Sequence, residues 1–482
     1  MKFDFTPDPK VLIALTHTPM QPLDALCELI DNAIDSFYGA KIQGLKADNP
    51  MVIVTLPSRK QLSENGGILR IQDNGPGMSP QNAEKAIKAG FSGNNPYDTL
   101  GLFGMGFNIS TGKLGNITTF MTSREDMDSY VKTVIDLEKI NSTKDYSLDA
   151  EKIAKASDDP YFKPGSHGTI IEVKDWWPQG NANSGFVQKL VQYGLPKIRE
   201  EIGRRYATIL RKGEIKIFIN EGKCEAYEHC VWDDSRYVVR KSGNVPAVMR
   251  FDQVVGSTKR CGTCTAILGT SDTCCPSCGS TKIRTVEERV RGWIGIQRFD
   301  SDTDFGIDLI RNGRAIRIGE KNAFFEYVDE FKHVTKDYPI DSQYGRIVGE
   351  INLDFVPVDF LKQDFQRSSA EWQRAMTFIR GTALCSQVSP EPLRTTLLFT
   401  NYTRHTDVSA LLVVAICIWV TGMLTAAAQN VSVETQRRNT MRNSSRNFLV
   451  SMMMVNGGNL WNLLISRPQR NCRNALCAEH KI

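Results

Sequence analysis

Residues 26–37 read LCELIDNAIDSF, and this stretch decides the fold of the first part of the chain. Its apolar residues recur at steps of three and four, which predicts one buried stripe of an amphipathic helix. Glu28, Asp31, Asn32 and Asp35 keep the same rhythm and form a second, polar stripe beside the core edge. Two interpretations are open: a solvated acidic face, or a site for magnesium and water with an oxygen ligand one turn from a carboxylate.

The totals describe a folded chain of more than one domain. At 482 residues, with 41% hydrophobic and 23% charged residues, two or three domains are expected. The start, MKFDFTPDPK, has no basic segment followed by a long apolar run, so no signal peptide is indicated and a cytoplasmic protein is expected.

The net charge of +5 is no argument for nucleic-acid binding, because the surplus lies at one end. From Thr382 onward there are ten Lys and Arg against four Asp and Glu, which leaves 49 against 50 for residues 1–381. The body is neutral, so any DNA contact has to be argued from a site.

Residues 382–482 form an aberrant tail. After Lys362 the only lysine is Lys481, and Arg, Ser, Asn, Thr and Met dominate instead. The break in composition suggests a shifted reading frame or an unrelated extension, which resequencing the DNA would decide. Within the tail, residues 410–428 carry no charge and are long enough to cross a bilayer, so a membrane anchor stays open.

The order of patterns before the tail is mixed α and β. Strand-like runs at 51–56 and 68–72 are followed by a helix-like segment at 81–90 and a long glycine-rich loop, which predicts an α/β sandwich over the first 180 residues. Next come a helix at 195–210 and strands at 214–220 and 346–356. A hairpin at 304–318 turns at Asn312-Gly313, so a second α+β domain is expected.

Two CxxC pairs predict a zinc ribbon at 258–283. Cys261, Cys264, Cys275 and Cys278 offer four thiolates at a spacing suited to tetrahedral zinc. A pair of disulfides is the competing interpretation, and it is disfavoured without a secretion signal. Cys274 could replace Cys275 as a ligand. A closed set of four thiolates indicates a structural metal that staples an excursion between two strands.

Two glycine-rich segments could hold a nucleotide. In IQDNGPGMS (71–79), Asp73 ends a strand and could accept a hydrogen bond from an exocyclic amine, with Gly75 and Gly77 just beyond it. In LGLFGMGFN (100–108), three glycines precede a helix-like start and could expose amides to phosphate oxygens. Taken alone, each segment is also an ordinary turn or loop.

The order of these motifs along the chain resembles the four nucleotide-binding boxes of the GHKL ATPases, the superfamily of DNA gyrase, the ninety-kilodalton heat-shock chaperones, histidine kinases and MutL. The segments CELIDNAIDS, GLFGMGFNISTGKLG and FLKQDF look most like the MORC branch. The resemblance implies a Bergerat-type ATP-binding α/β sandwich at 1–190. It also implies a transducer-like α+β domain at 195–380, into which the zinc ribbon is inserted.

The resemblance implies a role for each matched residue. Glu28 is similar to the general base that deprotonates the attacking water, Asn32 to the Mg²⁺ ligand, and Lys362 to the transducer lysine that reaches the γ-phosphate. The remaining matches are similar to residues that line the nucleotide. These are Asp73, Gly75, Gly77, Met78 and Thr169 at the adenine, with Gly168 preceding Thr169, and Gly101, Gly104, Gly106 and Phe107 in the lid around the phosphates.

The implied activity is ATP hydrolysis with Mg²⁺, in which ATP closes the lid and joins two chains into a homodimer that gates or clamps duplex DNA. A chaperone-type ATPase acting on protein clients is the alternative, and a regulator that hydrolyses ATP slowly or not at all is a third class. A histidine kinase is disfavoured, because none of the six histidines lies in a His-Glu pair. The sequence does not identify the partner or the pathway.

Overall fold

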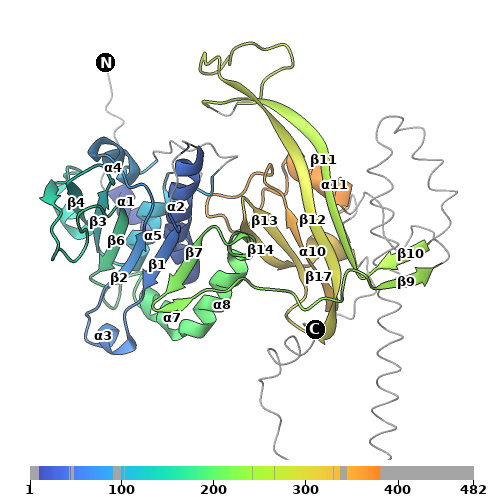
Figure 1. The fold of residues 1–482 in the computed structure, drawn as a ribbon, viewed down its shortest axis with the longest axis horizontal. Helices are drawn as coiled ribbons and strands as arrows, with labels where there is room; N and C mark the ends of the chain where they lie inside the picture. Colours follow the sequence, from blue (N-terminus) through green and yellow to red (C-terminus); the bar gives the residue numbers. More distant parts are fainter. Residues whose placement is uncertain are drawn as a thin grey trace, which may run out of the picture.

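The computed structural model describes residues 10–379 except 43, 45–47, 91–98, 102–103, 241–242, 265, 329–330 and 337–344. This part forms two domains, each with its own sheet and hydrophobic core (Figure 1). The predicted tail at 382–482 and its apolar run at 410–428 lie outside the described residues. No helix within the described ranges is both long and apolar enough to cross a bilayer.

The first domain is built on an eight-stranded mixed sheet. In spatial order its strands are β5 (Ala150–Ala154), β4 (Ser129–Asp136), β3 (Ile117–Ser123), β6 (Gly168–Lys174), β2 (Leu69–Asp73), β1 (Met51–Thr55), β7 (Lys216–Ile219) and β8 (Gly222–Lys223). All neighbours are antiparallel except β1 and β7, which pair in parallel.

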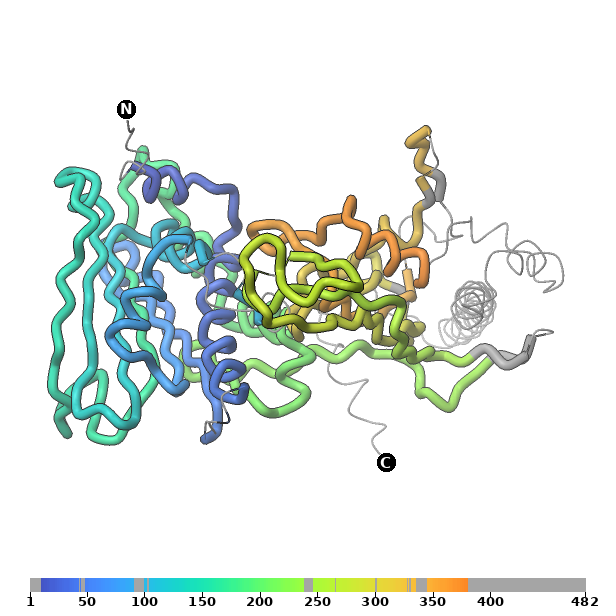
Figure 2. The backbone as a smooth tube through the Cα atoms, turned by 90° about the horizontal axis from the view of Figure 1, so that it is seen from above, coloured from blue at the N-terminus to red at the C-terminus, as the bar shows by residue number. Residues whose placement is uncertain are grey.

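Helices accompany this sheet. They are α1 (Lys10–Thr16), α2 (Pro22–Ile42), α3 (Arg59–Ser63), α4 (Pro80–Ile87), α5 (Gly106–Leu114), α6 (Leu137–Thr143), α7 (Phe186–Gln192), α8 (Leu195–Arg205) and α9 (Ala207–Lys212). The longest, α2, stands on the side of the first domain that faces the second (Figures 1 and 2). Its residues Leu26, Ile30 and Ile34 are fully buried, as the apolar spacing predicts.

The border between the domains differs from the predicted one at 190–195. Helices α8 and α9 and strand β7 belong to the first domain, because Ile198 and Ile202 are buried in its core and Ile217 pairs with Val52 of β1. The spacing of Ile198 and Ile202 on one helix face produces this packing. The first domain therefore continues past residue 220.

The second domain contains a five-stranded sheet in the order β11 (Val248–Cys261), β12 (Ile283–Ser301), β17 (Gly345–Asn352), β13 (Gly306–Arg311) and β14 (Arg314–Glu320). The predicted turn at Asn312-Gly313 joins β13 to β14, and both residues have positive φ, as such tight turns require. The smaller elements are β9 (Tyr237–Arg240), β10 (Gly243–Pro246), α10 (Asn322–Phe325), β15 (Glu326–Val328), β16 (Val334–Lys336) and α11 (Ala370–Ile379).

Strands β11 and β12 continue beyond the sheet as a two-stranded arm (Figure 1). The arm ends where β11 stops at Cys261 and β12 begins at Ile283. The four predicted zinc ligands lie in and next to the segment between these strands, so they form an excursion between two strands, as the sequence predicts.

Candidate functional site: a buried carboxylate between two domains

The polar stripe of α2 is buried. Glu28, Asp31 and Asp35 are 5%, 0% and 8% exposed, so the alternative of a solvated acidic face is wrong for these three carboxylates. Asn32 lies on the exposed side of the same helix, one turn from Glu28. Burying carboxylates is costly without partners, and each of the three has them.

Glu28 is held by two cations from the second domain. Lys362 Nζ lies 2.9 Å from Glu28 Oε2, and an Arg314 Nη lies 3.0 Å from Oε1. The side chains of Lys362 and Arg314 are 3% and 1% exposed. The two residues lie 334 and 286 positions away along the chain, so the fold alone brings them to the helix.

Asp31 completes this cluster. Its Oδ2 accepts hydrogen bonds from Lys362 at 2.8 Å and from Arg314, and its Oδ1 accepts one from the Tyr206 hydroxyl at 2.8 Å. Burial opposes the charge of Asp31, but Arg314 and Lys362 hold the pKa of this carboxyl below its usual value. Two carboxylates and two cations therefore balance in a buried cluster.

A tight loop presents Lys362. Val358 and Phe365 form an isolated bridge, and the Asp359 amide donates to the Asp364 carbonyl at 2.9 Å. Lys362 lies within this loop with φ +53°, a left-handed conformation that is uncommon for a residue with a side chain. Such backbone outliers persist where the surrounding structure holds them, and they cluster at functional sites.

Helix α5 begins directly against Glu28. A Cβ added to Gly106, its first residue, would lie 2.4 Å from Glu28 Oε2, so a larger residue there would displace the Glu28 carboxylate. The amides of the first turn of this nine-residue helix thus start beside the carboxylate. The ring of Phe107, a predicted lid residue, is buried against Phe120. Only its backbone amide is therefore left to contact a ligand.

The other lid glycines lie at the ends of the glycine-rich loop. The Gly90 amide donates to the Gly104 carbonyl at 2.9 Å. Asp35 accepts from the amides of Leu100 and Gly101 at 2.7 and 2.5 Å. Burial raises the pKa of the Asp35 carboxyl to about 7, against the effect of those two amides.

Asp73 and Thr169 lie side by side, as the predicted adenine site requires. Asp73 ends β2 and is paired with Thr169 on β6, which is paired in turn with Thr122 on β3. The Thr122 hydroxyl lies 3.2 Å from that of Thr169 and accepts the amide hydrogen bond of Met78 at 3.1 Å. Three adjacent strands thus present one polar row.

The glycines of this segment are needed for close approach. The Gly75 amide donates to Asp73 Oδ1 at 2.8 Å, and a Cβ on Gly75 would lie 2.3 Å from Ser36 Oγ of α2. At Gly77, with φ +66°, a Cβ would lie 1.8 Å from the Ser123 carbonyl oxygen. The Gly75 carbonyl accepts from His167 Nδ1 at 2.6 Å, which fixes the segment to the residue before Gly168.

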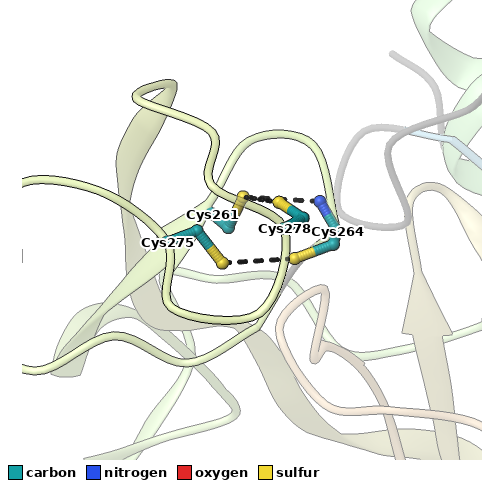
Figure 3. Close-up of side chains that lie close together, drawn as sticks. All are labelled: Cys261, Cys264, Cys275 and Cys278. Carbon is teal, nitrogen blue, oxygen red and sulfur yellow. Dashed lines mark hydrogen bonds between the residues drawn. The ribbon is translucent and has the colours of Figure 1, made fainter.

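The four predicted cysteines converge at the tip of the arm (Figure 3). Cys264 and Cys275 sulfurs lie 3.4 Å apart, those of Cys261 and Cys278 lie 3.6 Å apart, and all four fall within 4.8 Å of one another. Zinc at about 2.3 Å from each sulfur needs edges of roughly 3.8 Å, so this set fits zinc, whereas a disulfide needs about 2.05 Å. Cys275 is in the cluster and Cys274 is exposed outside it.

Sequence reasoning missed three residues of the buried cluster. Helical spacing places Asp31 only on a stripe, and no sequence pattern predicts a role for Tyr206. Arg314 directly follows the Asn312-Gly313 turn, but this position alone does not distinguish it from the other arginines of the chain.

Comparison with known proteins agrees with this placement. A family model described as histidine kinase-, DNA gyrase B-, and HSP90-like ATPase matches residues 20–169, which include Glu28, Asn32, Asp73, the glycines 101–106 and Thr169. The curated relatives include three proteins of Arabidopsis thaliana. Protein MICRORCHIDIA 1 is 31% identical over 107 residues, which is 22% of this chain and 15% of that protein.

Protein MICRORCHIDIA 3 is 33% identical over 91 residues (19% of this chain, 14% of that protein), and Protein MICRORCHIDIA 2 is 32% identical over 91 residues (19% and 13%). The match therefore spans only 15% or less of the length of each of these relatives. Residues 20–169 of this chain are a domain of the GHKL ATPase type, and the chain is similar to the MICRORCHIDIA proteins over about a fifth of its length.

Proposed function

We propose that the chain hydrolyses ATP, with Glu28 as the general base. The observation that carries the proposal is the position of the Glu28 carboxylate, buried between the first residue of α5 and a lysine from the second domain. Helix N-termini favour phosphate, and a carboxylate beside one is placed to take a proton from attacking water. Asn32 would hold Mg²⁺, which neutralises phosphate charge when bound.

Asp73, Thr169 and Lys362 take the roles that bind and sense the nucleotide. Asp73 accepts from the adenine amino group, with Thr169 beside it, while Gly77 and Met78 lie along the base. Lys362 moves from Glu28 to the γ-phosphate, so the second domain acts as a transducer that supplies a positive charge to the reaction.

The lid end is joined to both domains, which supports coupling between hydrolysis and domain movement. Asp35 of α2 holds the amides of Leu100 and Gly101 on one side. On the other, the Asn312 side-chain amide of the β13–β14 turn donates to the Thr99 carbonyl at 2.8 Å. A change of lid position on nucleotide binding therefore acts on the second domain directly.

We propose further that lid closure joins two chains, and that the closed dimer gates or clamps duplex DNA. The likeness to the MICRORCHIDIA proteins motivates this role. A chaperone-type ATPase with protein clients is the second candidate, because residues 1–381 carry 49 basic and 50 acidic side chains and offer no basic surplus to DNA. For the arm, we propose a structural zinc ion held by Cys261, Cys264, Cys275 and Cys278.

The test of the base is Glu28→Ala. We expect this variant to bind ATP with unchanged affinity and to lose turnover by at least about 100-fold, because proton transfer typically contributes 10²–10⁴-fold. Binding of a fluorescent ATP analogue and phosphate release measure the two properties. Turnover equal to that of the unaltered chain would remove Glu28 from its role.

The DNA question needs a separate experiment. Turnover is measured with and without duplex DNA at two salt concentrations, and mass is measured by light scattering with a non-hydrolysable ATP analogue. Stimulation that weakens with salt, together with doubling of the mass, supports the clamp. Doubling of the mass without any response to DNA favours the chaperone.

A further inference from the structure

The two oxygens of the Glu28 carboxylate have different neighbours. Oε2 faces the start of α5, where a Cβ on Gly106 would lie 2.4 Å from it, and it accepts from Lys362 at 2.9 Å. Oε1 accepts from Arg314 at 3.0 Å. Only Oε2 therefore lies next to the helix end at which the proposed function puts the phosphates.

The two cations are held in different ways. Lys362 lies on the loop between Val358 and Phe365 and has a flexible side chain that ends in a single ammonium. Arg314 is the first residue of β14, and its side chain is 1% exposed. Both cations also contact Asp31, a fully buried carboxylate, so what differs is the element that carries each cation and the group with which it bonds.

A lysine ammonium on a carboxylate oxygen occupies one lone pair and stabilises the anion, which makes that oxygen a weaker base. Glu28 therefore becomes a stronger base at Oε2 when Lys362 leaves that oxygen, and a bound γ-phosphate offers Lys362 another anionic partner. Arg314 bonds to Oε1, whereas Oε2 is the oxygen that contacts the start of α5, so a phosphate bound there would compete for Lys362 and not for Arg314. One cation is released in the reaction, and the other stays.

We propose that Arg314 is a positioning residue, which holds Oε1 of Glu28 so that Oε2 is the oxygen that takes the proton, while Lys362 covers Oε2 until the nucleotide arrives. This inference rests on the proposed function. Arg314 then joins Asn312 as a second residue near the β13–β14 turn that belongs to the ATPase site. The inference also explains why two cations from the second domain contact one carboxylate.

The experiment compares Arg314→Ala with Arg205→Ala in the full chain. Arg205 pairs with Asp24, another α2 carboxylate one turn before Glu28, at 2.8 Å, so it is a matched control outside the site. We expect Arg314→Ala to lower kcat by about 10–100-fold, the range expected when a catalytic group is misplaced by about 1 Å. The dissociation constant of the fluorescent ATP analogue should change less than about twofold, because Arg314 does not reach the nucleotide. Arg205→Ala should keep kcat.

A purely structural role of Arg314 would also lower kcat, so chemical rescue of the variant distinguishes a positioning role from a structural one. Guanidinium ion at millimolar concentration should restore turnover of Arg314→Ala at least about fivefold, because it can fill the space of the missing side chain with the same charge and donors. Urea, which has a similar shape without charge, should not. If Arg314→Ala does not fold, Arg314→Lys replaces it and should lower kcat with nucleotide affinity retained.

The outcomes separate the two proposals. No turnover by the unaltered chain overturns the proposed function and this inference with it. Turnover that Arg314→Ala leaves intact, or a loss that guanidinium does not restore, overturns only the inference. A parallel loss of kcat and nucleotide affinity in Arg314→Ala also overturns it, because Arg314 would then act on binding.

Discussion

Asp73 ends β2 in surroundings that oppose its charge. Burial raises the pKa of the Asp73 carboxyl to about 7, and hydrogen bonds from the amides of Gly75 and Thr169 offset only part of that rise. Oδ1 already accepts from Gly75. A protonated carboxyl has fewer acceptor sites and a donor that an amino group cannot use. The proposed recognition of adenine by Asp73 should therefore depend on pH near neutrality.

We expect ATP to bind more weakly as the pH falls below about 7, by up to about tenfold per pH unit, because binding then requires Asp73 to release a proton. Above pH 7 the carboxyl is already ionised, and the affinity should level off. Calorimetric titration from pH 5.5 to 8.5 in two buffers gives both the dissociation constant and the number of protons released.

Asp73→Asn is the control, since it keeps the shape and cannot titrate. This variant should bind ATP more weakly by a factor set by one charge-assisted hydrogen bond, roughly 10–100-fold, and should release no extra protons at low pH. A flat affinity in the unaltered chain across this range would show that Asp73 does not contact the base.

The sequence predicts which carboxylates of α2 share one stripe, but it does not predict their partners. Helical spacing was enough to place Glu28, Asp31 and Asp35 on one stripe, and the structure buries all three. Their partners could not be read from spacing, because the Arg314 and Lys362 contacts join positions 286 and 334 residues apart. Lys362 was found only through the family motif FLKQDF, and Arg314 has no comparable motif.

The arm formed by β11 and β12 depends on more than its backbone pairing. Its side chains are tied to α11 by Arg260 to Glu371 at 2.8 Å and by Arg374 to Glu288 at 2.6 Å. At the tip, the amides of Cys264 and Thr263 donate to the Cys261 sulfur at 3.4 and 3.3 Å. Amides that point at sulfur favour the thiolate form that metal ions require.

Zinc content tests the arm. We expect one zinc per chain by mass spectrometry of the metal after gel filtration, and Cys275→Ser should weaken the site by more than the roughly 10–100-fold that an outer partner costs. Cys274→Ser is the matched control, because Cys274 is adjacent but outside the cluster, and it should keep the metal. Equal zinc in both variants, or loss only in Cys274→Ser, would contradict the assignment.

For strand β7, the sequence predicts the element but not its neighbour in the sheet. The sequence predicts a helix at 195–210 and a strand at 214–220, and it predicts both as parts of the second domain. The structure pairs β7 with β1, more than 160 residues earlier. Parallel pairing of distant strands has no turn signal between them, so the sequence did not indicate the partner.

The two domains are held together by charged contacts as well as by the Glu28 cluster. Arg204 of α8 bonds to Asp304 at 2.8 Å and to Asp308 at 3.1 Å, and its guanidinium lies 4.6 Å from the centre of the Tyr227 ring. The side chains of Arg204 and Asp308 are 16% and 4% exposed. These contacts between the domains help to hold Lys362 and Arg314 in position against α2.

We expect Arg204→Ala to lower the stability of the chain by about 3–5 kcal/mol, since two largely buried carboxylates lose their arginine and keep only the Tyr227 hydroxyl, the Gly319 amide and His229. Turnover should fall while the affinity for ATP is kept, because the proposed adenine site, Asp73 with Thr169, lies in the first domain. The midpoint of thermal unfolding, phosphate release and analogue binding measure the three properties. Lys197→Ala on the same helix is the control: Lys197 is 49% exposed and pairs with Glu200 and Glu201 at the surface, and such pairs contribute at most about 1 kcal/mol. If both variants unfold and turn over alike, the Arg204 contacts do not join the domains, and presentation of Lys362 depends on the buried cluster alone.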